Sequence, residues 1–135
     1  MKHPSWLIAL NVVLALLFVV AAGLQYNDPD PARWIALYGG AAVATVLALH
    51  TRRGWLLAGA VGAIGAVWGG LLWADVLGQV VFSDMWRKMS EKGGKVEVLR
   101  EAGGLTLVVT WLSVTSLLGW NRARATAAEV AKAGR

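Results

Sequence analysis

Four apolar stretches, each close to the length that crosses a bilayer, constrain this chain more than any other feature of its sequence. A helix needs about 20 mostly apolar residues to span the hydrocarbon core. The fourth apolar run, residues 105–120, is shorter than this, so we extend its helix back into the more polar residues before it. The sequence therefore predicts an all-α, polytopic membrane protein, a four-helix bundle over residues 1–122 with spans at about 6–24, 32–50, 55–77 and 97–120.

Both ends of the chain leave an alternative open. The first apolar run follows Lys2, and Ala21-Ala22-Gly23 resembles a signal-peptide cleavage site. The run is longer than the 7–15 residues of a typical signal-peptide core, which favours a membrane span. At the other end, residues 123–135 are predicted to be a cytoplasmic tail, either a short amphipathic helix on the membrane surface or a frayed end.

The composition agrees with a membrane protein and excludes several other classes. Hydrophobic residues make up 57% of the 135 residues and charged residues 16%, whereas soluble domains average about 45–50% and 25%. A chain of this length has too little interior to hide so much apolar surface, and disordered chains are rich in charge. The absence of cysteine excludes disulfides and thiolate metal sites. Because the net charge of +5 comes from residues that flank the spans, we expect no nucleic-acid partner.

The distribution of lysine and arginine favours an orientation with both termini on the cytoplasmic side. An even number of spans places the termini on one face, which carries seven basic residues against six on the other. Arg52 and Arg53 fill a very short loop on that face, and Arg122 and Arg124 directly follow the last span. We therefore assign this face to the cytoplasm and the protein to the cell (inner) membrane. Nearly all acidic residues lie on the opposite, outer face. This uneven distribution indicates either a solvated loop face or a functional site.

Small residues at four-residue spacing predict how two of the spans pack. They are Ala36, Gly40, Ala44 and Ala48 in the second span and Ala58, Gly62, Ala66 and Gly70 in the third. Such stripes let membrane helices approach closely. Together with the tight loop at 51–54, they predict a close antiparallel hairpin of these two spans.

The first polar segment on the outer face is residues 25–31. Asp30 fits the N-cap of the second span, with Pro31 at the first helical position. The residues before it are typical of a turn, but capping does not require their polar side chains. Two interpretations of this segment are therefore open, a helix cap with a turn and a binding site. The candidate ligand-binding residues in and after this segment are Gln25, Asn27, Asp28, Asp30, Trp34 and Tyr38.

The second polar segment lies at the mouth of the last span. Glu97, Arg100 and Glu101 share one helix face there, and all three are candidate ligand-binding residues. The alternative is a solvated helix start, because acidic side chains are favoured at a helix N-terminus. Gly103 and Gly104 would allow a neighbouring element to approach closely at the same level.

The two segments together resemble the transmembrane protein 220 family. The resemblance rests on Gln25-x-Asn27-Asp28-Pro29-Asp30 with Trp34 and Tyr38, and on Glu97-x-x-Arg100-Glu101-x-x-Gly104-Leu105. The spacing of these blocks, the four spans and the length also agree, so the resemblance covers most of the chain. It implies a small polytopic membrane protein whose signature residues coincide with the two polar segments. It implies no biochemical activity, because the family is essentially uncharacterised.

The donor set of these segments is made of oxygen atoms. The candidate metal ligands are Asp28, Asp30, Glu97 and Glu101. A shell of carboxylate and carbonyl oxygens suits a divalent cation such as Ca²⁺ or Mg²⁺ rather than Zn²⁺ or copper. Without a metal, Arg100 would pair with Asp28 or Asp30 and tie the last span to the first loop.

Three hypotheses for function are therefore open. In the first, the outer-face cluster binds a cation or a small polar or lipid-headgroup ligand without turnover. In the second, the chain is a membrane-embedded enzyme that uses the same carboxylates on a lipid-like substrate. In the third, it is a structural or accessory subunit in which the cluster is only an ion-pair clasp. The expected partners are membrane lipids, with a second copy of the chain or another membrane protein as further candidates.

Overall fold

Every regular element of this protein, within the part that the structure describes, is helical. The computed structural model describes residues 3–134. The long helices are α1 (Ser5–Leu24), α2 (Pro31–His50), α3 (Gly54–Val76) and α4 (Lys95–Ala133), and the short 3-10 helices are η1 (Gln25–Asn27), η2 (Phe82–Trp86) and η3 (Glu91–Gly94). All four long helices are apolar enough to cross a membrane, which confirms the predicted four-span, all-helical architecture. Lys2 and Arg135, which were counted in predicting the orientation, lie outside the described residues.

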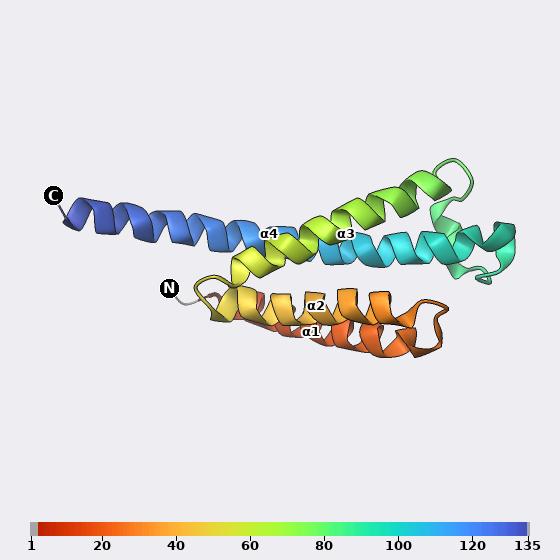
Figure 1. Ribbon diagram of the computed structural model, residues 1–135, viewed down its shortest axis with the longest axis horizontal. Helices are drawn as coiled ribbons and strands as arrows, with labels where there is room; N and C mark the ends of the chain where they lie inside the picture. Colours follow the sequence, from red (N-terminus) through yellow and green to blue (C-terminus); the bar gives the residue numbers. More distant parts are fainter. Residues whose placement is uncertain (1–2, 135) are drawn as a thin grey trace.

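The four helices form two antiparallel pairs (Figure 1). The first pair is α1 with α2, and α4 packs against it from the other side together with α3. From its start near α2, α3 crosses α4 at an angle, so that its far end diverges from α2. Both termini lie toward the same end of the bundle. Residues 123–133 belong to α4 and extend beyond the bundle as part of the same helix, with no separate tail segment.

The closest helix contact is made by glycines of α3 facing α4. A Cβ atom at Gly65 would lie 3.2 Å from Val109, and one at Gly69 would lie 3.2 Å from Leu105. Because glycine places no side chain in the interface, the backbones approach and gain van der Waals contact, which is the main attraction between helices in lipid. This contact fixes α4 along most of the length of α3.

The predicted hairpin of the second and third spans is present, because α2 and α3 are in contact, but α3 packs more extensively on α4 and only part of the predicted stripe is buried. The buried small residues of α3 are Gly54, Ala58, Gly62, Gly65 and Gly69. Ala66 and Gly70 of the predicted stripe are exposed, and so is Ala36 of α2. A strict four-residue step advances by about 400° and drifts around the helix by about 40° each time. Alternating steps of four and three residues keep one face toward a single neighbour, and on α3 that face meets α4.

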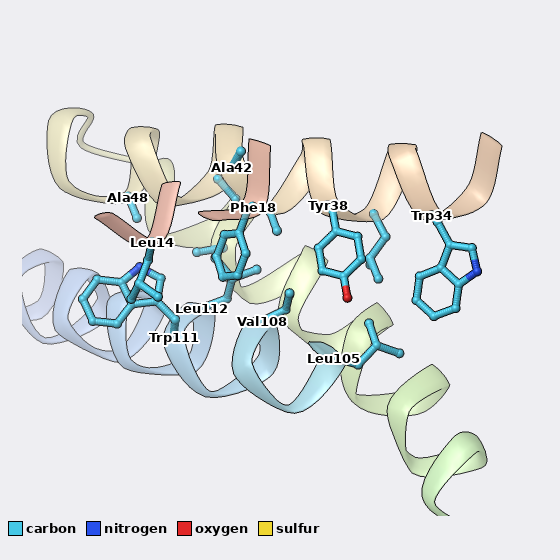
Figure 2. Close-up of a cluster of buried hydrophobic side chains, with 14 of the residues drawn as sticks. Leu14, Phe18, Trp34, Tyr38, Ala42, Ala48, Leu105, Val108, Trp111 and Leu112 are labelled. Atoms are coloured by element: carbon cyan, nitrogen blue, oxygen red, sulfur yellow. The ribbon is translucent and has the colours of Figure 1, made fainter. Parts of the chain in front are cut away.

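A buried core joins α1 and α2 to α4 (Figure 2). Its labelled residues are Leu14 and Phe18 of α1, Trp34, Tyr38, Ala42 and Ala48 of α2, and Leu105, Val108, Trp111 and Leu112 of α4. Trp34 also stacks against Trp68 of α3, with 4.3 Å between the ring centroids. The core is therefore closed at the end opposite the termini by an aromatic contact that links α2 to α3.

One polar side chain ties α1 to α2 inside the bundle. Asn11 is 2% exposed, and its Nδ2 atom donates a hydrogen bond of 3.1 Å to the backbone carbonyl of Thr45. A polar group buried among apolar helices is costly unless it finds a partner. Asn11 therefore fixes the register of α1 against α2 as well as adding to their contact.

At the end of the bundle where the termini lie, His3 contacts α4. Arg122 Nη1 donates a hydrogen bond to His3 Nε2 at 2.6 Å. Burial, and next the positive charge of Arg122, hold the pKa of His3 below its ordinary value of about 6.5. Neutral imidazole is thus the form that the folded protein holds, since only that form can accept from a guanidinium.

We expect the His3–Arg122 contact to stabilise the protein above about pH 6.5 and to weaken as the pH falls. The sign follows from the lowered pKa of His3, because acid protonates the unfolded chain more readily than the folded one. The measurement is the thermal unfolding temperature in detergent from pH 8 to pH 5, for the wild type and His3→Ala. The difference between the two should shrink toward low pH. A difference that grows on acidification would contradict this assignment.

We expect Gly119→Ala to destabilise the bundle by roughly 1–3 kcal/mol, as overpacking does. A Cβ atom at Gly119 would overlap the Trp55 Cβ atom and lie 2.8 Å from Trp55 Cγ, both too near the backbone of α3 to move aside. Gly70→Ala is the matched control, because nothing lies within 4 Å of its added Cβ atom. Thermal unfolding in detergent should separate the two variants, and equal losses would contradict the described packing of α3 on α4.

Candidate functional site

Three carboxylates meet at the end of the bundle opposite the termini. One ligand oxygen from each of Asp28, Glu97 and Glu101 lies within 4.8 Å of the other two. Each of the three residues is partly buried. Asp28 comes from the segment before α2 and the two glutamates come from α4, so the cluster joins parts of the chain that are far apart in sequence.

The backbone before α2 holds Asp28 in place. It follows η1, and its N–H donates to the Gln25 carbonyl at 3.0 Å. One oxygen of its side chain, Oδ1, accepts the N–H of Asp30 at 2.9 Å. Such an aspartate turn is a local hydrogen bond that competes with helix formation. It fixes the direction of the carboxylate just before α2 begins.

The two glutamates lie in the first turns of α4. Gly94 precedes the helix with a left-handed φ of 83°, which glycine adopts without strain. Glu97 and Glu101 are four residues apart, so their side chains lie on the same face, one turn above the other. The negative charges of Glu97 and Asp28 both act on Glu101, and the positive charge of Arg33 opposes them.

Trp34 and Tyr38 are buried side chains one turn apart on α2. They are 2% and 7% exposed, and their rings stack with 6.0 Å between centroids. The Tyr38 hydroxyl points toward α4 in Figure 2, where a Cβ atom at Gly104 would collide with it. A Cβ atom at Gly103 would lie 2.8 Å from the Met85 Cε atom. The expectation that these two glycines admit a close neighbour is confirmed.

The structure separates two of the proposed residues from the three carboxylates. Asp30 is exposed and pairs with Arg33 at 2.6 Å, and it is not among the clustered acidic groups. Its side chain makes no capping hydrogen bond at the start of α2, although Pro31 does occupy the first turn. Arg100 is exposed and forms no ion pair within residues 3–134, so the predicted pairing with Asp28 or Asp30 does not form there. Asp30 pairs with Arg33 rather than with Arg100 because Arg33 lies only three residues away in the same segment.

The remaining predicted residues lie beside Asp28 in the same turn. Gln25 is half-buried and Asn27 is exposed, and both belong to η1. Sequence reasoning overlooked Arg33, whose guanidinium carbon also lies 5.4 Å from the centre of the Trp68 ring. Its spacing of three residues from Asp30 was the signal that could have indicated the pair.

The family model for transmembrane family 220, helix, matches residues 17–117 of this chain. The chain belongs to this family. The matched range contains both polar segments and all three clustered carboxylates, as well as α2 and α3 in full. Comparison with curated proteins and with solved structures finds no match. For this member of transmembrane family 220, the chemistry of the site must therefore be argued from its own geometry.

That geometry predicts repulsion among the carboxylates when no cation is bound. With chelator present, Glu101→Gln should raise the thermal stability by roughly 0.5–1 kcal/mol, because it removes one negative charge beside two others. Asp30→Asn is the matched control and should bring no gain, since Asp30 already has Arg33 as a partner. Thermal unfolding in detergent with EDTA measures both. A loss of stability in Glu101→Gln would show instead that its carboxylate makes a stabilising contact of the clasp type.

Proposed function

We propose that this membrane protein binds a divalent cation through Asp28, Glu97 and Glu101. The observation that carries the proposal is the convergence of the three carboxylates, whose ligand oxygens lie within 4.8 Å of one another. They come from two segments, and no ion pair within residues 3–134 neutralises them. Like charges gathered in this way repel one another, and a bound cation would relieve that repulsion.

The size and donor chemistry of the cluster favour Ca²⁺. Oxygen ligands surround Ca²⁺ at about 2.3–2.6 Å, so two ligands on opposite sides of one ion lie about 5 Å apart. The three carboxylate oxygens lie within that limit. Ca²⁺ takes 6–8 oxygens in flexible geometry, whereas Mg²⁺ demands a near-ideal octahedron and retains several waters. Water or a polar lipid headgroup would complete the shell on the open side, next to Asn27.

The alternatives receive less support. An ion-pair clasp needs Arg100 to face the carboxylates, but Arg100 is exposed and Asp30 pairs with Arg33. An enzyme acting on lipid-like substrates would also need an apolar groove that leads to the cluster. Two hollows, of about 430 and 340 Å³, lie elsewhere, one around His3 and Arg122 and the other between α3 and α4 around Gly62.

We further propose that the carboxylates face the outer side of the cell (inner) membrane, with both termini in the cytoplasm. The end of the bundle with the termini carries Arg52 and Arg53 in its short loop and Arg122 and Arg124 on α4. Basic residues close to span ends favour the cytoplasmic side. The acidic cluster then lies at the outer boundary of the membrane.

Ligand-dependent stability tests the cation site. Ca²⁺ at one hundred times its Kd should stabilise the detergent-solubilised protein by about 2.7 kcal/mol, and EDTA should reverse the effect. Mg²⁺ at the same concentration should act more weakly. Asp28→Asn and Glu101→Gln should abolish the response, while Asp30→Asn should retain it because Asp30 lies outside the cluster.

Two outcomes would contradict the proposal. One is an unfolding temperature that is the same with Ca²⁺ and with EDTA in the wild type. The other is a Ca²⁺ response that persists undiminished in both Asp28→Asn and Glu101→Gln, which would place the cation at another site.

A further inference from the structure

The segment between α3 and α4, residues 77–94, is folded around one buried carboxylate, and we name it the Asp84 loop. Asp84 is 1% exposed. Its Oδ1 atom pairs with Arg87 Nε at 3.0 Å, and its Oδ2 atom accepts from Lys92 Nζ at 2.6 Å and from the Val81 N–H at 2.8 Å. The buried carboxylate is therefore satisfied from both sides of the loop, and the contacts link η2 to η3.

The ends of the Asp84 loop are fixed as well. Lys95 Nζ lies 2.7 Å from Asp75 Oδ1, which ties the first residue of α4 to the last turn of α3. Two residues before Asp75, Trp73 Nε1 donates a hydrogen bond to Thr106 Oγ1 at 2.9 Å. The hydrogen bond from Lys92, followed by that from the Val81 N–H, holds the pKa of Asp84 below its ordinary value. Asp84 is thus ionised at neutral pH.

The conformation of the Asp84 loop turns large apolar side chains outward. Leu77, Val81, Phe82 and Trp86 are 70%, 61%, 71% and 75% exposed. The rings of Phe82 and Trp86 contact each other edge to face, with 5.4 Å between centroids. The loop therefore buries one carboxylate and exposes several large apolar side chains together with the basic Arg87, Lys88 and Lys92. Such a surface marks contact with another apolar phase.

Three features indicate that this phase is the bilayer. The loop joins two membrane spans, so it begins and ends at the membrane boundary. It also directly follows α3, an apolar helix on which Leu71 is 67% exposed. Tryptophan is typical of the headgroup level, and the neighbouring Arg87 and Lys88 suit the phosphates of lipids.

We infer that the Asp84 loop is a rigid membrane-interface anchor that inserts Val81, Phe82 and Trp86 between the lipid headgroups and is held in shape by the buried Asp84. The loop packs onto the start of α4, where Met85 approaches Gly103. Its depth in the membrane therefore sets the depth of the first turns of α4. This role stands independently of cation binding.

Spin labels on single cysteines test the inference directly, because the natural chain contains no cysteine. Phe82→Cys and Trp86→Cys are labelled, with Lys88→Cys as the matched control in the same loop. The variants are reconstituted in vesicles of phosphatidylcholine and phosphatidylglycerol. Power-saturation electron paramagnetic resonance then compares collisions with oxygen, which partitions into lipid, against collisions with a water-soluble nickel chelate.

We expect an oxygen-to-nickel collision ratio several-fold higher at Phe82 and Trp86 than at Lys88. Equal ratios at the three positions would overturn the inference, because the loop would then lie in water. Labels at Phe82 and Trp86 that are immobile and shielded from both reagents would also overturn it, because a second copy or another protein would then cover this face.

Asp84→Asn tests the part assigned to the buried carboxylate. It should move the ratio of the Phe82 label toward the Lys88 value, while thermal unfolding confirms that the helices remain folded. An unchanged ratio at Phe82 in this variant would overturn the role of Asp84.

Discussion

The close contact of α3 with α4 is the interaction on which the rest of the structure depends. Glycines at 62, 65 and 69 remove side chains from this interface and let α4 lie against most of the length of α3. The contact fixes the position of α4 along the bundle axis relative to α2. At that position, Tyr38 of α2 lies against Gly104 of α4. Because Glu97 and Glu101 lie in the first turns of α4, the position of α4 along the bundle axis decides whether their carboxylates lie next to Asp28. The packing of the helices and the position of the three carboxylates therefore depend on the same contact.

The number of helices and their approximate bounds could be predicted from the sequence, because length and hydropathy alone decide whether a segment can span a bilayer. The sequence could not predict that α3 packs more extensively on α4 than on α2. Glycine and alanine make up 11 of the 23 residues of this helix and lie on several of its faces, so composition does not single out the contacting face. The choice depends on the side chains of α4 that fill the space, such as Leu105 and Val109. That information lies on another helix.

The candidate site was predictable in its residue types and only partly in its geometry. The two polar segments supplied Asp28, Glu97 and Glu101, which the fold brings together. Asp30 forms an ion pair with Arg33 instead, because a partner three residues away is within reach without any long-range packing. The Asp84 loop was not predicted at all. Its network depends on left-handed turns at Lys92, Gly93 and Gly94 that return Lys92 to Asp84, and no periodic pattern records such turns.

Calorimetric titration of Ca²⁺ into the purified, metal-free protein tests the central claim most directly. The account predicts saturable binding of one ion per chain in the wild type and in Asp30→Asn, and no binding in Asp28→Asn. The comparison isolates the cluster, because the two aspartates lie in the same turn and differ in whether they face Glu97 and Glu101 or Arg33. Absence of binding in the wild type, or equal binding in both variants, would contradict the assignment of the three carboxylates as a cation site.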